Sequence, residues 1–309
     1  MHAHSASVTG PHQVALPLTG TTAASLLLLY ALLYVLPLYA SESTRPSRTL
    51  SRDSPIVIRG RITSVTISTT LCSVLTFLLL SALSEDGSSS PLRAMGYCPL
   101  GFWEALRSLL LVALLFAGPL YEALIIDGLW KNWITLQPLY SVWNEWTSWR
   151  NLVMGPVTEE LLFRSAAVPL LLGAGVTLSK IVFITPIIFG VAHIHHFYEF
   201  RLTHPHVPVF AAVARSLLQL TYTTLFGAYA TFVFIRTGSL LSIIVVHAFC
   251  NSMGLPRFWG HVQPYWTYPG PPSWKWTSLY YVLLVSGSVA WWKQLWPLTA
   301  SDNALASWD

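Results

Sequence analysis

The hydrophobic and polar positions of this chain form long apolar tracts separated by short polar connections. A helix needs about 20 mainly apolar residues to cross a bilayer core of about 30 Å. This rule predicts a bundle of about eight transmembrane helices, at 15–39, 62–83, 105–126, 153–174, 179–198, 208–235, 238–254 and 277–297. The third, fourth, fifth and seventh of these spans contain polar residues that a hydropathy scale penalises. We therefore expect an all-α polytopic membrane protein in which these four spans are of functional interest.

The composition supports a membrane protein. Hydrophobic residues make up 53% of the 309 residues and charged residues only 10%, against roughly 25% charged residues in soluble domains. Since no segment between the tracts is long enough for a separate soluble core, we expect a single transmembrane domain over 1–309. No basic patch interleaved with aromatics accompanies the net charge of +4, so we expect no nucleic-acid partner. The three cysteines are too few and too irregularly spaced for a disulfide framework or a Cys-type zinc site.

The orientation of the bundle is indicated by the connection between the first two predicted spans. This loop is rich in arginine: it holds Arg45, Arg48, Arg52, Arg59 and Arg61. Cytoplasmic loops carry an excess of Lys and Arg. We therefore expect the loop to face the cytosol and, with eight spans, both termini to face the lumen.

Ionisable residues inside a span are functional candidates, because each costs about 2.5–3.5 kcal/mol at mid-bilayer. The first group lies in GPVTEELLFR, residues 155–164, near the start of the fourth span. Adjacent Glu159 and Glu160 point about 100° apart on a helix, whereas Arg164 lies four residues after Glu160 on the same face. We expect Glu160 to pair with Arg164 and to leave Glu159 free. A purely structural ion-pair network is the alternative.

The second group is FGVAHIHHFYE, residues 189–199, at the exit of the fifth span. His193 lies one helical turn after Phe189, and His195 and His196 follow it. A lone histidine here would more often be a satisfied core or interfacial residue. Three histidines in four positions also suggest metal ligands, although their spacing matches none of the usual zinc helices.

The third group is HAFCNSMG, residues 247–254, at the end of the seventh span. His247 and Asn251 are four residues apart and project from one helix face. A ring N–H beside an amide NH₂ suits an oxyanion hole. The alternative is an interhelical hydrogen bond, worth about 0.6 kcal/mol on average in membranes.

Helix parity places the three groups at one side of the membrane. Glu159 lies near the entry of one span, His193 near the exit of the next, and His247 with Asn251 near the exit of the seventh. At a rise of 1.5 Å per residue they lie roughly 5–15 Å from that surface, a depth at which a water-filled cavity can open. The arginine-rich loop predicts that this side is cytosolic.

Three motifs in order on the expected helices resemble the Abi/CAAX protease family of glutamate-type intramembrane enzymes: EExxxR from Glu159, FxxxH from Phe189 and HxxxN from His247. The stretches RNLVMGPVTEELLFR, FGVAHIHH and TYTTLFGAYATFVFIRTGSL are similar to its eukaryotic type 2 branch, the Ras-converting CAAX prenyl endopeptidases. The similarity covers about residues 150–254, which we expect to be the catalytic core. The earlier spans and the tail match only in hydropathy.

The resemblance implies a multi-pass enzyme of the endoplasmic-reticulum membrane that removes the C-terminal -AAX tripeptide from prenylated CAAX proteins, such as Ras-like GTPases. Its active site would open to the cytosol, next to membrane lipid. By motif position, catalytic Glu159 and His193 would activate water, while His247 and Asn251 would stabilise the oxyanion. Supporting residues Glu160 and Arg164 would set the position of Glu159. The resemblance implies no metal and no cofactor.

Two other interpretations stay open at the level of sequence. A zinc-dependent membrane hydrolase could use Glu159, His193 and His247 as ligands, which is a permissible zinc set. Asn251 argues against it, because metal binding explains that residue poorly and an oxyanion hole explains it well. A non-proteolytic membrane scaffold of the same fold is the second alternative, and the intact polar set argues against lost catalysis.

Overall fold

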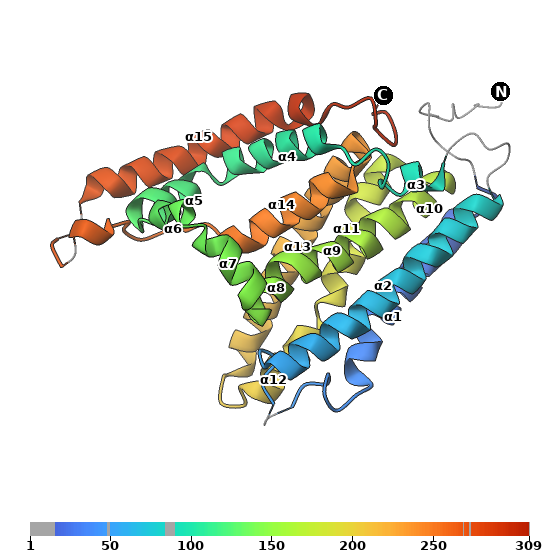
Figure 1. The fold of residues 1–309 in the computed structure, drawn as a ribbon, viewed down its shortest axis with the longest axis horizontal. Coiled ribbons are helices and arrows are strands. Elements are labelled where there is room, and N and C mark those ends of the chain that lie inside the picture. The colour runs from blue at the N-terminus through green and yellow to red at the C-terminus, as the bar shows by residue number, and fades with distance from the viewer. Residues whose placement is uncertain (1–15, 48–49, 84–89, 268, 272, 309) are drawn as a thin grey trace.

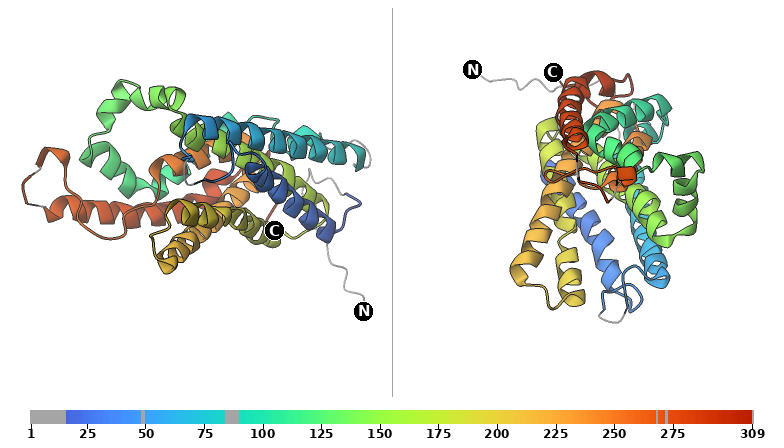
Figure 2. Two further views of the ribbon diagram at one scale, coloured as in Figure 1. Left: turned by 90° about the horizontal axis from the view of Figure 1, so that it is seen from below. Right: turned by 90° about the vertical axis from the view of Figure 1, so that its left-hand side faces the viewer.

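The computed structural model of the chain describes residues 16–47, 50–83, 90–267, 269–271 and 273–308. Over these ranges the chain forms helices and no strand, which confirms the predicted all-α class. In Figures 1 and 2, α15 (Trp274–Thr299) and α4 (Phe102–Leu115) cover one side of the molecule, while α1 (Gly20–Val35), α2 (Pro55–Leu83) and α12 (His195–Thr203) lie toward the opposite side. Helices α9 (Gly155–Glu160), α11 (Leu178–Ala192) and α14 (Leu240–Met253) run between these two sides (Figure 1).

The N-terminal helices α1 (Gly20–Val35) and α2 (Pro55–Leu83) pack against each other at the edge of the molecule (Figure 1). Thr19 caps α1, since its hydroxyl oxygen accepts a hydrogen bond from the backbone N–H of Thr22 at 3.1 Å. This satisfies one of the donors that every helix start leaves open. A 3₁₀ turn at Leu36–Tyr39 then leads into the arginine-rich loop.

The segment around the two adjacent glutamates is helical throughout but irregular. The π-helix η4 (Arg150–Met154) precedes α9 (Gly155–Glu160), and the π-helix η5 (Leu161–Ala166) separates α9 from α10 (Ala167–Gly173). All six residues of η5 except Leu161 are buried. π turns are rare in proteins overall, and those that occur lie frequently at functional sites. This segment is therefore distinguished by its backbone as well as by its charges.

Helices α11 (Leu178–Ala192) and α13 (Val209–Thr237) pack closely through glycines. A Cβ atom on Gly190 would lie 2.5 Å from Thr224 Oγ1, and one on Gly227 would lie 2.8 Å from Pro186 Cβ. Small residues at such contacts let helix backbones approach within membranes. The short helix α12 (His195–Thr203) follows α11 and carries His195 and His196.

The C-terminal helix α15 (Trp274–Thr299) lies along α4 (Phe102–Leu115), and α14 (Leu240–Met253) packs on α4 from the other side. Gly287 permits the α15 contact, because a Cβ there would lie 2.3 Å from the Leu114 carbonyl oxygen. After α4 the chain bends by 84° into Ala117–Ile126, which comprises α5 (Ala117–Tyr121) and a π turn (Glu122–Ile126). The remaining short helices are α3 (Pro91–Ala94), α6 (Trp130–Ile134), α7 (Gln137–Asn144) and α8 (Trp146–Trp149).

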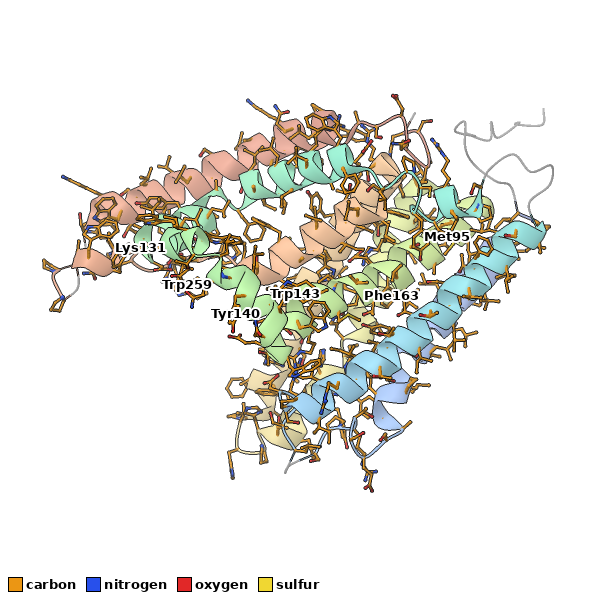
Figure 3. The ribbon with its side chains drawn as sticks, in the orientation of Figure 1. Met95, Lys131, Tyr140, Trp143, Phe163 and Trp259 are labelled. Atoms are coloured by element: carbon orange, nitrogen blue, oxygen red, sulfur yellow. The ribbon has the colours of Figure 1, made fainter. Side chains whose placement is uncertain are left out.

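Aromatic side chains are exposed on the arm that holds α6 and α7 and on the connection between α14 and α15. Figure 3 shows Lys131, Tyr140, Trp143 and Trp259 together in this part of the molecule. The Lys131 ammonium lies 4.7 Å from the ring centroid of Tyr265 and so links the arm to that connection. Exposed Trp and Tyr are typical of membrane interfaces. We expect this surface to lie at a headgroup boundary.

The predicted count of eight spans is not confirmed. Within the described residues four helices are long and apolar enough to cross a membrane, at Gly20–Tyr39, Pro55–Leu83, Leu178–Thr203 and Val209–Thr237, and the bent pair around α4 would be a fifth. The predicted span at 238–254 is an apolar helix of only 14 residues. The one at 153–174 is interrupted by a π turn. The protein is thus a polytopic membrane protein whose core helices are short or broken where the polar residues lie.

Candidate active site

Three of the six residues singled out in the sequence line one cavity of about 180 Å³: Glu159, His193 and Asn251. They come from α9, the end of α11 and the end of α14. The other three are buried beside the cavity and do not line it: Glu160, Arg164 and His247. Members of all three polar groups thus meet at one cavity, while their placement at one side of the membrane stays a prediction.

The buried cluster consists of Glu160, Arg164 and His247. Arg164 Nη1 donates to Glu160 Oε1 at 3.1 Å, and the two side chains are 0% (Glu160) and 1% (Arg164) exposed. His247 Nδ1 lies 2.6 Å from the same carboxylate oxygen. The predicted pairing of Glu160 with Arg164 is confirmed, and Glu159 is left facing the cavity. A buried charge pair is tolerated only when further hydrogen bonds satisfy it, and His247 supplies one.

Arg164 joins the glutamate segment to both glycine-packed helices. Its Nη2 atom donates to the backbone carbonyl of Gly227 at 3.2 Å, and its guanidinium carbon lies 4.7 Å from the ring centroid of Phe189. A Cβ on Gly227 would lie 3.2 Å from Nη2, which is tighter than ordinary contact. Glycine at this position therefore makes room for the buried guanidinium.

The hydrogen bond to Glu160 fixes the orientation of the His247 ring. An ionised carboxylate only accepts hydrogen bonds, so Nδ1 carries a proton. The other nitrogen, Nε2, then lies 3.8 Å from Glu159 Oε2. The resemblance implied that Glu160 sets the position of Glu159; Glu160 contacts His247, the ring that lies beside Glu159, and its effect on Glu159 stays a prediction. The carboxylates thus act on opposite sides of one imidazole.

His193 is oriented by its own helix. Its Nδ1 lies 2.8 Å from the carbonyl oxygen of Phe189, one turn earlier, and its ring packs against the Phe189 ring at 4.7 Å between centroids. A carbonyl only accepts, so Nδ1–H is the donor and Nε2 is the acceptor that the neutral ring offers. The FxxxH spacing therefore defines both the ring position and its tautomer.

Asn251 lies at the exposed rim of the cavity. Its Nδ2 donates to the backbone carbonyl of Asn151 at 2.9 Å, which uses one of two amide hydrogens. The neighbouring Cys250 does not line the cavity. Asn251, and not the thiol, is thus the group that α14 offers to a molecule in the cavity.

A second charged cluster lies at the cavity and was not identified from the sequence. Glu199 Oε1 lies 2.6 Å from Arg61 Nη2, and Glu199 Oε2 lies 3.5 Å from Arg52 Nη1 and 3.0 Å from His196 Nδ1. Arg150 belongs to it through Asp53, at 2.9 Å. Arg52, Arg61 and Arg150 all line the cavity. In the sequence, Arg52 and Arg61 indicated only the orientation of the loop, and Arg150 was only the first residue of the RNLVMGPVTEELLFR stretch.

Metal-ligating side chains do come close together in this second cluster. Ligand atoms of His195, His196 and Glu199 lie within 4.8 Å of one another, the one such set among the described residues. It shares no member with the zinc set considered from the sequence, which was Glu159, His193 and His247. Because Glu199 already binds two guanidinium groups, the local charge disfavours a cation there.

Comparison with known proteins gives the family. Residues 141–253 match the family described as Type II CAAX prenyl endopeptidase Rce1-like. No solved structure matches the chain. The matched range contains all six predicted site residues and every helix from α8 to α14.

Curated relatives extend the similarity beyond that range. The "Probable CAAX prenyl protease 2" of Schizosaccharomyces pombe is 36% identical over 274 residues, 89% of this chain and 92% of that protein. The "CAAX prenyl protease 2" of Arabidopsis thaliana is 36% identical over 246 residues, 73% of this chain and 77% of that protein. The human protein of the same name is 36% identical over 230 residues, covering 72% and 68%. With the three motifs ordered around one cavity, the chain belongs to the type II CAAX prenyl endopeptidase family.

Proposed function

We propose that the chain is an intramembrane endopeptidase that releases the C-terminal -AAX tripeptide from prenylated CAAX proteins by hydrolysis. The observation that carries the proposal is the placement of Glu159, His193 and Asn251 on one cavity, with His247 directly beside Glu159. Amide hydrolysis needs a base for water, donors for the developing oxyanion and a proton for the leaving amine. This set offers all three. The names of the relatives support the substrate class.

In the proposed mechanism a water molecule lies between Glu159 and His193. The water donates one hydrogen bond to His193 Nε2 and gives a proton to Glu159 as its oxygen attacks the scissile carbonyl. His247 Nε2, when protonated, and Asn251 Nδ2 donate to the oxyanion. The C–N bond then breaks, and Glu159 passes its proton to the leaving amine.

The buried cluster has a positioning role in this scheme. Glu160 holds His247 by Nδ1 at 2.6 Å, and Arg164 holds Glu160 at 3.1 Å. The ring cannot turn away from Glu159 without breaking a buried charged hydrogen bond. We propose that Glu160 and Arg164 fix the oxyanion donor and do not touch substrate.

We propose further that residues 150–254 form the catalytic core of a single membrane domain and that the cavity opens to the cytosol. The arginine-rich loop supports this orientation, since Arg52 and Arg61 line the cavity and positive loops face the cytosol. The family resemblance supports an endoplasmic-reticulum location and Ras-like GTPases among the substrates.

The zinc hydrolase and the scaffold remain as outcomes of the test. Purified protein is incubated with a farnesylated CAAX peptide, and tripeptide release is measured for wild type, Glu159→Gln and the exposed control Glu145→Gln. We expect release by wild type and the control and none by folded Glu159→Gln, because the amide keeps size but loses basicity. Wild-type turnover by folded Glu159→Gln would refute the base assignment, and no release by the wild type would favour the scaffold.

A further inference from the structure

The catalytic cavity carries more positive charge than the proposed hydrolysis uses. Arg52, Arg61 and Arg150 line it together with Glu159. Of the residues that the structure describes, Glu199 and Asp53 are the carboxylates paired with these arginines. Three guanidinium groups therefore share two carboxylates, while the third carboxylate, Glu159, lies beside His247 and forms no ion pair with these arginines in the described residues.

The guanidinium groups retain capacity to bind an anion. Arg61 donates from Nε to the Thr44 carbonyl at 2.8 Å and from Nη2 to Glu199 at 2.6 Å, and within the described ranges its Nη1 has no hydrogen-bond partner. Arg150 donates from Nε and Nη1, and its Nη2 likewise has no hydrogen-bond partner within the described ranges. A guanidinium with a free terminal nitrogen binds carboxylates through charge-assisted hydrogen bonds.

The distance from these arginines to the catalytic groups fits a short peptide. Arg150 lies nine residues before Glu159 in one helical segment, a separation of about 13 Å at the α-helical rise. Because both side chains line the same cavity, the distance between the guanidinium of Arg150 and the carboxylate of Glu159 is shorter than this backbone separation. Three residues of extended peptide span about 10 Å. Arg150 also lies close to the proposed oxyanion donor Asn251, because the Asn251 amide donates a hydrogen bond to the backbone carbonyl of Asn151, the residue after Arg150.

We infer that Arg52, Arg61 and Arg150 form a binding site for the free C-terminal carboxylate of the substrate. The inference rests on the proposed function and deepens it. A carboxylate bound at this site would place the peptide bond three residues before the chain end at the catalytic groups. A carboxylate bound there would accept hydrogen bonds from the guanidinium nitrogens that have no partner within the described ranges. The protein would therefore select a chain terminus, although it hydrolyses an internal peptide bond.

Two other uses of the cluster fit the observations less well. A cation bound by His195, His196 and Glu199 would lie against guanidinium groups that already occupy both oxygens of Glu199. A purely structural network explains Arg61, which is mostly buried, but it does not explain why three arginines face a cavity. An anionic ligand accounts for both the charge and the position.

The test compares two prenylated peptides of one sequence, one with a free C-terminal carboxylate and one with a C-terminal carboxamide. For the wild type we expect kcat/KM to be about 10- to 100-fold higher for the acid, the range that loss of a charged hydrogen bond gives. Arg150→Gln and Arg52→Gln should lower turnover of the acid and leave the amide nearly unchanged. Arg150→Lys should keep part of the preference. Arg59→Gln is the matched control, since Arg59 is exposed near the start of α2 and does not line the cavity.

The outcomes separate the two proposals. Equal turnover of acid and amide by the wild type would overturn the carboxylate site and leave the peptidase function intact. An unchanged acid preference in Arg150→Gln, Arg52→Gln and the double variant would also overturn it, as would equal losses on both peptides. Release from neither peptide by the wild type would overturn the proposed function and the inference with it.

Discussion

Two clusters in this protein contain the same three kinds of side chain, a carboxylate, an arginine and a histidine, and yet differ in burial and in access to the cavity. The buried cluster is Glu160, Arg164 and His247, and the cavity cluster is built on Glu199, Arg61 and His196. Exposed fractions of the buried set are 0%, 1% and 6%, against 4%, 13% and 18% for the cavity set. The first cluster does not line the cavity, and its Arg164 Nε and Glu160 Oε2 atoms are buried without a hydrogen-bond partner in the described residues. In the second cluster, Arg61 and His196 line the cavity and can reach a ligand.

The difference shows how one chemical combination serves two purposes. When one partner of a buried pair is removed, the other remains as an uncompensated charge in the core, which costs about 3–5 kcal/mol. Exposed pairs contribute about 0–1 kcal/mol, because water solvates whichever partner remains. The buried cluster is therefore suited to fix a catalytic ring, and the cavity cluster is suited to exchange one anion for another.

The largest expected effect on stability comes from breaking the buried cluster. Arg164→Leu leaves Glu160 without its cation and removes the bond to the Gly227 carbonyl. We expect a loss of about 3–5 kcal/mol in unfolding free energy, measured by thermal melting in detergent. Arg45→Leu is the control, since that exposed arginine pairs with Glu42 at the surface. A melting temperature equal to that of the control would contradict the distinction between the clusters.

The next effect tests the residue that links both clusters. Asn251 shares α14 with His247 and contacts Asn151, which follows Arg150. Asn251→Ala should lower kcat by roughly 10²–10³ as an oxyanion donor is lost, with KM little changed, in tripeptide-release assays. Ser252→Ala is the neighbouring control outside the cavity. An equal rise in KM with unchanged kcat would instead assign Asn251 to substrate binding.

A smaller effect is expected on the stability of the cavity cluster. Glu199→Gln removes the shared anion, but Arg52 is 39% exposed and water can solvate it. Because Glu199 is 4% and Arg61 13% exposed, we expect a loss above the about 1 kcal/mol of an exposed pair and below the about 3–5 kcal/mol of a fully buried one, again by thermal melting, with Glu42→Gln as the exposed control. A loss as large as that of Arg164→Leu would mean that the two clusters are equivalent.

No effect is expected from chelation. The set His195, His196 and Glu199 is close enough to share an ion, so metal removal asks whether the cavity cluster is a metal site. Prolonged treatment with ortho-phenanthroline, with the non-chelating meta isomer as control, should leave tripeptide release unchanged. Activity that is lost on chelation and restored by added zinc would revive the zinc hydrolase.

The buried cluster could largely be predicted from sequence, because helix geometry is local. The spacing of four between Glu160 and Arg164 was sufficient to predict their pair, and the same spacing places the carbonyl of Phe189 at the His193 ring. The second partner of Glu160 was not predictable. His247 lies 87 positions away, and no local rule selects the buried Glu160 over the cavity-facing Glu159 as its hydrogen-bond partner.

The cavity cluster was out of reach for the same reason. Arg61 and Glu199 are 138 positions apart, and Arg150 and Asp53 are 97 apart. Such arginines are indistinguishable in sequence from charges that only set membrane orientation. The span count was limited by another factor, since hydropathy cannot register the 84° bend after α4. Tertiary packing decides both features.

The two π turns that flank α9 make this segment sensitive to length. An α-helix advances by about 100° per residue, whereas a π turn accommodates an additional residue. Deleting one residue from Arg150–Met154 or Leu161–Ala166 would let the backbone relax to a regular helix and rotate the next helical turns by about 100°. Glu159 would then no longer face the cavity, or Glu160 would no longer face Arg164 and His247 in the core. The number of residues along the helix, and not side-chain identity alone, is therefore part of the information that this segment encodes.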